Sequence, residues 1–225
     1  MTLKIKFAVI ISLCFLLCAC VKQASYNFQG GYIPPSFKTD GHTFNFKPDT
    51  AHKNALQKKW NQVRDAEKQD PTFTGRILNM NDPVLIKEWA ELYDFLINVD
   101  IPTRLRYVNS FFNRFTFKDD DTNWGEAYWA TPREFLTKDG GDCEDYAIAK
   151  YYALKELGVS AERMFLTVVG YHDKKGLHAI LVVFEGNDYY VLDNLKKDTV
   201  YLNSTDKAFC PKQYYNEKMS KFHNY

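Results

Sequence analysis

Residues 140–158 read GGDCEDYAIAKYYALKELG, and this stretch decides how the chain folds around one cysteine. Two glycines break the preceding segment and Asp142 is an N-cap residue, so we predict a helix that runs to Leu157 and stops at Gly158. Cys143 is then the first helical residue, where the helix dipole favours a thiolate. The pattern predicts a nucleophile at a helix N-terminus, although a small core residue beside an ordinary cap has the same pattern.

A predicted β-hairpin further along the chain supplies partners for this thiol. Two strand-like runs flank the turn EGND at residues 185–188. A symmetric turn places His178 and Asp193 on the same face of adjacent strands, with their backbones roughly 7–8 Å apart. An imidazole and a carboxylate can meet across that gap. We therefore predict a triad in which Cys143 attacks a carbonyl, His178 moves the proton and Asp193 orients the imidazole.

Three acidic residues lie beside this thiol, namely Asp142, Glu144 and Asp145. Like charges so close raise the pKa of a thiol and oppose the thiolate. Acids at a helix N-terminus are favourable in themselves, because Asp142 caps the helix and Asp145 completes a capping box, but this leaves Glu144 unexplained. A hard cation would bind the carboxylates and cancel their charge, so we predict that the three acids bind Ca²⁺. The DDD run at residues 119–121 either adds oxygen ligands or is a solvated polar loop.

The order of the predicted elements indicates an α+β fold. Amphipathic patterns predict helices over residues 50–68 and 83–99 and another from Ile101. Thr131-Pro132-Arg133-Glu134 is a capping box that starts a short helix. Strand-like runs follow at residues 164–170, 177–184 and 189–193, which favours an antiparallel sheet packed on helices. The residues predicted to face the core from the three longer helices are Leu56, Trp60, Val63, Glu67, Leu85, Trp89, Leu92, Leu96, Leu105, Val108, Phe112 and Phe115.

The composition excludes several other classes of protein. The chain has 225 residues, of which 45% are hydrophobic and 16% aromatic, enough to bury a core. A net charge of +1 argues against a sequence-independent nucleic-acid binder, so we expect no nucleic-acid partner. Five cysteines are too few for a disulfide-rich scaffold of this length.

The N-terminus indicates export. Two lysines and the apolar run at residues 7–17 are typical of a signal peptide, which we assign to residues 1–19. Leu17-Cys18-Ala19-Cys20 resembles a bacterial lipobox, which predicts a lipid anchor at Cys20. Residues 20–48 are expected to be a lead or tether, and residues 49–225 the folded domain.

Export also changes the expected state of the cysteines. Once the signal peptide is removed and Cys20 is lipidated, Cys143 and Cys210 remain. In an oxidising compartment thiols tend to pair. The two cysteines therefore either form a disulfide or leave one thiol free for chemistry.

The motifs as a set resemble one protein family. Residues 128–136 (YWATPREFL), the block around Cys143, and His178 followed by VLDN at residues 191–194 resemble the bacterial transglutaminase-like cysteine proteinases of the LapG type. The resemblance covers roughly residues 50–205. It implies a papain/transglutaminase-like core with a Cys-His-Asp triad. It also implies a bound Ca²⁺ held in part by Asp142 and Glu144.

The same resemblance implies a biological role. The substrate class is the N-terminal region of a large biofilm adhesin, cut at a di-alanine site in the periplasm so that the adhesin leaves the cell surface. An inner-membrane cyclic di-GMP receptor is the implied inhibitor. A lipid anchor at Cys20 departs from the soluble periplasmic form of the family. Val21 after that cysteine would favour the outer membrane, where the adhesin is held.

Three functions therefore compete. We favour a calcium-dependent cysteine endopeptidase. The second is another thiol acyl-transfer enzyme on the same scaffold, either a transglutaminase or a cell-wall peptide amidase, since all pass through a thioester. The third is a non-catalytic calcium-binding module in which Cys143 pairs with Cys210. A free thiol would exclude the third, and the reaction products would separate the first two.

Overall fold

The computed structural model describes residues 55–171, 177–186, 188–195, 215 and 217, together with the backbone of short strands between residues 38–48 and 200–222. All of these belong to one structural unit, Ile33–Tyr225. The predicted signal peptide, Cys20 and most of the predicted tether lie outside the described residues. Within the described part of the chain, no helix has both the length and the apolar character needed to cross a membrane.

Helices make up the first half of this unit, as predicted. The longer ones are α1 (Ala55–Gln69), α2 (Pro83–Leu96) and α3 (Ile101–Phe112). Asp82 begins α2 by accepting hydrogen bonds from two backbone N–H groups, and Asp100 begins α3 in the same way with one. Their predicted apolar stripes are buried or partly buried in one continuous core.

Helix α2 ends at Leu96, earlier than predicted, and one arginine satisfies the carbonyls at its end. Arg104 donates to the carbonyl oxygens of Leu96 (2.8 Å) and Ile97 (3.0 Å). The same guanidinium donates to the Leu157 carbonyl at 2.8 Å, at the end of another helix. The last carbonyls of a helix need such donors, so Arg104 joins two helix ends that are far apart in the sequence.

The predicted polar loop at residues 119–125 contains a short helix. Helix α4 spans Asp120–Asn123, and Asp119 is its N-cap, with its side chain accepting from the Thr122 N–H at 2.9 Å. Acids in a first turn favour a helix, which accounts for the difference from the prediction. A second short helix, α5 (Pro132–Thr137), begins at the predicted capping box of Thr131 and Glu134.

The second half of the chain forms an antiparallel sheet. The three strands that the sequence predicts are β8 (Met164–Tyr171), β9 (Leu177–Glu185) and β10 (Asp188–Leu192), and every strand pair in the sheet is antiparallel. The strand order is β11-β10-β9-β8-β12-β13-β3, completed by β11 (Val200–Tyr201), β12 (Phe209–Tyr215), β13 (Ser220–Phe222) and β3 (Lys47–Pro48). The predicted α+β class with an antiparallel sheet is confirmed.

Short pieces of secondary structure connect these layers. Two-residue strands pair antiparallel as β1 (Lys38–Thr39) with β2 (His42–Thr43), and as β4 (Phe73–Thr74) with β5 (Ile77–Leu78). Strand β6 (Thr116–Phe117) pairs parallel with β7 (Gly140–Gly141), just before the cysteine helix. A single 3₁₀ turn (Ala161–Arg163) leads into β8.

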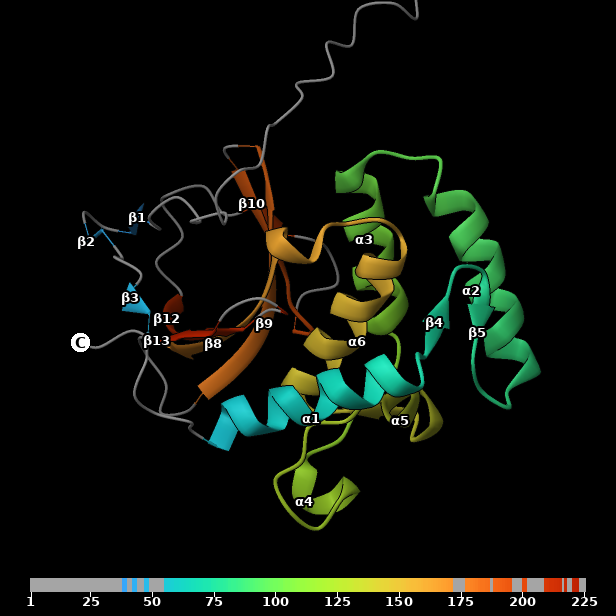
Figure 1. The fold of residues 1–225 in the computed structure, drawn as a ribbon, viewed down its shortest axis with the longest axis horizontal. Helices are drawn as coiled ribbons and strands as arrows, with labels where there is room; N and C mark the ends of the chain where they lie inside the picture. Colours follow the sequence, from blue (N-terminus) through green and yellow to red (C-terminus); the bar gives the residue numbers. More distant parts are fainter. Residues whose placement is uncertain are drawn as a thin grey trace, which may run out of the picture. The chain divides into compact units, whose positions relative to one another are not determined.

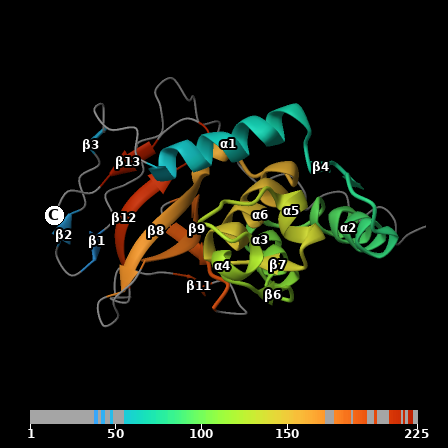
Figure 2. The ribbon, with the colours of Figure 1, turned by 90° about the horizontal axis from the view of Figure 1, so that it is seen from below.

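The helix that carries the cysteine lies at the centre of the unit. Helix α6 (Cys143–Glu156) is buried at every position from Asp145 to Leu154. A helix buried on all sides must be enclosed by other elements. It contacts β8 and β9 on one side and α3 and α5 on the other, and Figures 1 and 2 show strands and helices on these two sides. Helix α1 adds the ring of Trp60, whose centroid lies 5.3 Å from that of Tyr151.

Candidate active site

Cys143 is the first residue of α6, as the sequence predicts. Asp142 is the N-cap residue and forms a capping box with Asp145, whose Oδ2 accepts from the Asp142 N–H at 3.4 Å. A Cβ atom at Gly141 would overlap the Asp145 carboxylate, and one at Gly140 would overlap the Thr116 backbone. The two glycines therefore allow the protein's own groups to approach the start of the helix.

The thiol of Cys143 is free and half-buried. The alternative in which it pairs with Cys210 is therefore wrong; the Cys210 side chain lies outside the described residues. The Cys143 thiol donates to Glu144 Oε2 at 3.1 Å. Burial and the negative charges of Glu144 and Asp142 raise its pKa, while a hydrogen bond from the Ala179 backbone N–H opposes that rise. Burial and the neighbouring carboxylates thus favour the protonated form of this thiol.

His178 and Asp193 meet at the place that the hairpin register predicts. Leu192 pairs with Leu181 across β9 and β10. This register puts the side chains of His178 and Asp193 on the same face of the sheet. His178 Nε2 lies 2.9 Å from Asp193 Oδ1, and both side chains are buried, with 6% and 2% of their surface exposed. His178 is the neighbour of Ala179, whose N–H contacts the Cys143 thiol. The start of α6 therefore meets β9 next to the predicted base.

Asp193 is held in place by further contacts. Its Oδ1 also accepts from the Leu195 N–H at 2.9 Å, and its backbone carbonyl accepts from Asn113 Nδ2 at 2.8 Å. Burial alone would raise the pKa of Asp193. The hydrogen bonds from His178 and Leu195, with the positive charges of His178 and Lys150, hold that pKa below its usual range. Asp193 is thus an ionised, fixed acceptor for the imidazole.

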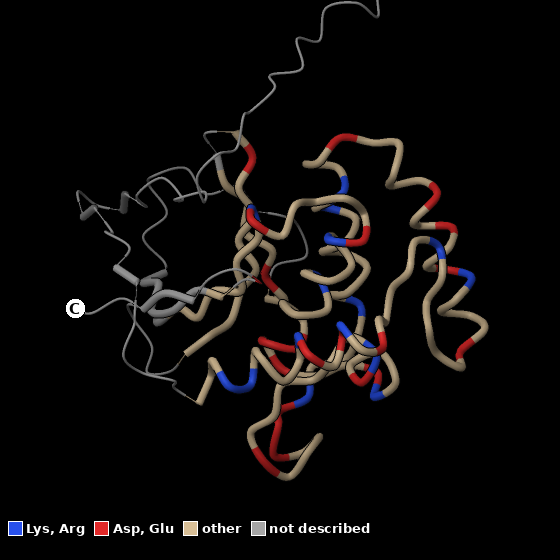
Figure 3. The backbone as a smooth tube through the Cα atoms, in the orientation of Figure 1, with Lys and Arg blue, Asp and Glu red and all other residues tan. Residues whose placement is uncertain are grey.

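The acidic residues form two overlapping groups that share Asp142. One contains Asp142, Cys143 and Glu144, and the other contains Asp120, Asp142 and Asp145, with one ligand atom from each residue within 4.8 Å of the others. Asp120 comes from α4, where Figure 3 shows the acidic run in red. From the sequence alone, the DDD run at residues 119–121 is either a source of further ligands or a solvated loop, and Asp120 is the residue of that run that lies in the second group.

Burial and mutual repulsion raise the pKa values of the aspartates in these groups. Burial, and then the charges of Glu144, Asp145 and Asp120, raise the pKa of Asp142 to about 9. Burial likewise raises the pKa of Asp145 to about 8, against a hydrogen bond from the Ala130 N–H at 2.8 Å. The pKa of Asp120 is raised mainly by burial, although the Tyr128 N–H donates to its Oδ2 at 2.6 Å. The cluster carries more negative charge than its protein donors can stabilise.

Two carboxylate oxygens are available for a cation. Asp120 Oδ1 and Asp142 Oδ1 are buried and accept no hydrogen bond within the described part of the chain. Both oxygens of Asp145 accept backbone N–H groups, so that residue also ties Ala130 to the start of α6, as the capping interpretation predicts. Clustered carboxylate oxygens with unused lone pairs fit a hard divalent cation such as Ca²⁺.

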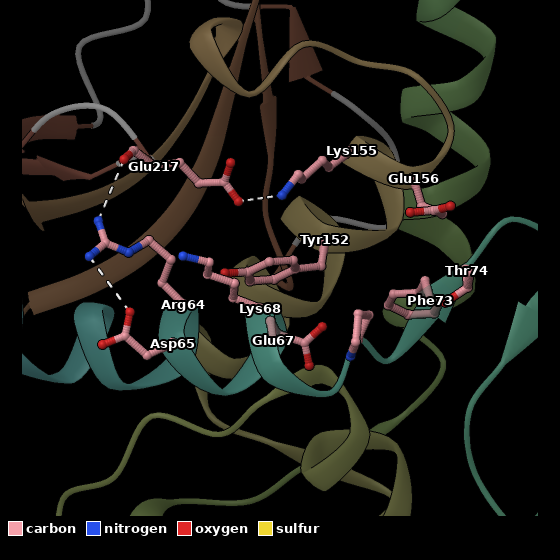
Figure 4. A pocket seen from close by; sticks show the side chains of 11 residues that line it. Arg64, Asp65, Glu67, Lys68, Phe73, Thr74, Tyr152, Lys155, Glu156 and Glu217 are labelled. Carbon is pink, nitrogen blue, oxygen red and sulfur yellow. Dashed lines mark hydrogen bonds and ion pairs between the residues drawn. The ribbon is translucent and has the colours of Figure 1, made fainter.

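A separate pocket of about 540 Å³ opens between α1, β4 and α6 (Figure 4). Its walls carry both signs of charge, including the ion pair of Lys155 with Glu217 and the contact of Arg64 with the Glu217 carbonyl. Cys143, His178 and Asp193 do not line it. The pocket is therefore distinct from the candidate active site.

Comparisons with known proteins show which family and which solved folds the chain is similar to. The family model described as bacterial transglutaminase-like cysteine proteinase matches residues 90–222. Calcium-bound LapG of Legionella pneumophila is 26% identical with a TM-score of 0.54, over 71% of this chain and 87% of that one. EGTA-treated LapG of the same organism is 25% identical with a TM-score of 0.55, over 72% and 86%. The predicted transglutaminase-like core is confirmed. The comparison with curated proteins finds no match.

Proposed function

Because the chain belongs to the bacterial transglutaminase-like cysteine proteinases, we propose that it is a calcium-dependent cysteine endopeptidase with Cys143, His178 and Asp193 as its catalytic residues. The observation that carries the proposal is the buried hydrogen bond of 2.9 Å between His178 and Asp193, one residue from the backbone N–H that contacts the free thiol. A structural histidine needs neither an ionised carboxylate nor a nearby helix-opening cysteine, whereas the combination fits a Cys-His-Asp triad.

The reaction follows from these positions. The Cys143 sulfur attacks the carbonyl carbon of the scissile peptide bond as its proton passes to His178. The C–N bond breaks, His178 returns the proton to the leaving amine, and a thioester remains. Water then attacks the thioester with His178 as the base, which releases the new carboxyl group and restores the thiol. Asp193 keeps the imidazole oriented throughout, and the Cys143 backbone N–H at the helix N-terminus is the expected oxyanion donor.

We propose that Asp120, Asp142, Glu144 and Asp145 hold the calcium ion. The two unpartnered oxygens of Asp120 and Asp142 support this assignment, and a calcium-bound form of the similar Legionella protein is consistent with it. A bound Ca²⁺ would supply positive charge that offsets the carboxylates beside the thiol. With that charge offset, the helix dipole and the Ala179 N–H can stabilise the Cys143 thiolate.

The substrate and location are proposed from the family resemblance alone. We propose that the enzyme acts in the periplasm on the N-terminal region of a large biofilm adhesin, at a di-alanine site, and releases the adhesin from the cell. A lipid anchor at Cys20 would hold the enzyme at the outer membrane beside that substrate. An inner-membrane cyclic di-GMP receptor is the proposed inhibitor.

A cleavage assay tests the proposal. The protein without its predicted signal peptide is incubated with an adhesin N-terminal fragment that contains a di-alanine, in calcium or in a chelator. We expect one cut that requires calcium and is absent in Cys143→Ala, which removes only the nucleophile. Cleavage that persists in Cys143→Ala would refute the assigned nucleophile. If nothing is cut, amine incorporation into the same fragment would identify a transglutaminase instead.

A further inference from the structure

Helix α6 contains a buried lysine that the proposed mechanism does not use. Lys150 has 0% of its surface exposed, and its Nζ makes no hydrogen bond within the described part of the chain. The centroid of the Tyr146 ring lies 5.6 Å from Nζ. A buried ammonium without a partner is strongly unfavourable, so a lysine at such a position calls for an explanation.

The position of Lys150 on α6 relates it to the proposed triad. It follows Cys143 by seven residues, which is about two helical turns and about 10 Å along the axis on the same helix face. Helix α6 packs against β9, the strand of His178, as Figure 1 shows. The start of α6, with Cys143, therefore lies next to the strand of His178. Lys150 lies two helical turns further along α6, where the negative charge of Asp193 acts on its pKa.

Lys150 and Asp193 each stabilise the ionised form of the other. Burial lowers the pKa of Lys150 to about 7, and the negative charge of Asp193 opposes that shift. Conversely, Asp193 is 2% exposed, and the positive charge of Lys150 is one of the influences that keep it ionised.

We propose that Lys150 is a positioning residue that acts through Asp193: its buried ammonium keeps Asp193 ionised, so that Asp193 holds the His178 imidazole in the orientation that serves Cys143. This inference rests on the proposed function and deepens it. Lys150 is fully buried and does not reach the substrate. Its removal therefore lowers the rate of the chemical step and leaves substrate binding intact.

The test compares two lysines of the same helix. Lys150→Met removes the charge but keeps a long, adaptable side chain, and Lys155→Met is the matched control at an exposed position. We expect Lys150→Met to lower kcat at least about tenfold with KM within about twofold, and Lys155→Met to change neither beyond about twofold. The rate of Cys143 alkylation by iodoacetamide in calcium gives a second readout that needs no substrate. It should fall by at least about fivefold in Lys150→Met alone.

A double-mutant cycle separates action through Asp193 from a general loss of structure. Asp193→Asn removes the group on which Lys150 acts, so adding Lys150→Met to it should lower kcat by less than about twofold further. A full additional tenfold loss in that background would overturn the proposal. So would wild-type kcat in Lys150→Met.

The fold of each variant is checked by circular dichroism, with Lys150→Gln as a second neutral substitution. If both neutral variants fail to fold while Lys150→Arg folds, the role of the lysine is structural and the proposal is wrong. A different result is expected if the proposed protease function itself is wrong. In that case the wild-type protein shows neither cleavage nor alkylation of Cys143 faster than that of a free thiol.

Discussion

Removing calcium should make the stability of the protein fall steeply as the pH rises. In the calcium-free protein the pKa of Asp142 is about 9 and that of Asp145 about 8, against 3.8 for an ordinary aspartate. The native state therefore retains protons that the unfolded chain has already released at pH 7. The stability that these protonated acids contribute is fully present below about pH 4 and is lost as the pH rises towards 8–9.

The size of this loss follows from the pKa shift. Each pH unit between the unfolded and folded pKa values lowers the free energy of unfolding by about 1.4 kcal/mol per group. Counting Asp142 alone, the loss between pH 5 and pH 8 is about 4 kcal/mol. For a domain of this length, that lowers Tm by roughly 10 °C. A bound calcium ion keeps the carboxylates ionised in the native state, so the loss disappears when calcium is present.

Thermal unfolding by circular dichroism measures this directly. We expect calcium, relative to a chelator, to raise Tm by roughly 10 °C more at pH 8 than at pH 5. Asp142→Asn should abolish most of that difference. Asp121→Asn should retain it, because Asp121 is an exposed acid next to Asp120 that belongs to neither acidic group. An equal calcium effect at both pH values, or the same loss in both variants, would refute the reasoning.

Three further outcomes are expected. Asp193→Asn should lower kcat by about 10²–10⁴ because the imidazole loses its anionic acceptor; turnover near that of the wild type would make Asp193 an ordinary strand-end residue. Gly141→Ala should lower the free energy of unfolding in urea by about 2–3 kcal/mol, since the new Cβ displaces Asp145 from the helix cap. Arg104→Ala should lower the free energy of unfolding by about 2–4 kcal/mol, because three helix-end carbonyls lose their donor. The control Arg106→Ala, at an exposed position, should change it by less than about 0.5 kcal/mol. Equal effects of the two arginine variants would contradict the role given to Arg104.

Short-range patterns predicted the features that depend on neighbours in the chain. Asp82, Thr131 and Asp142 begin helices where the sequence indicates, because an N-cap acts on backbone groups two or three residues away. The approach of His178 to Asp193 was also predictable, since a tight turn sets the register of both strands. The catalytic roles of these residues stay predictions for the experiments above.

The sequence by itself thus determined the α+β class, the helix that begins at Cys143, and the face that His178 and Asp193 share. Only the tertiary structure decided that Asp120 joins the acids at the cysteine, and that Lys150 lies within reach of the Asp193 charge. The physical reason is the range of the interactions involved. Caps and turns act within a few residues, whereas these two contacts join distant segments and exist only because α6 is enclosed between the sheet and the other helices.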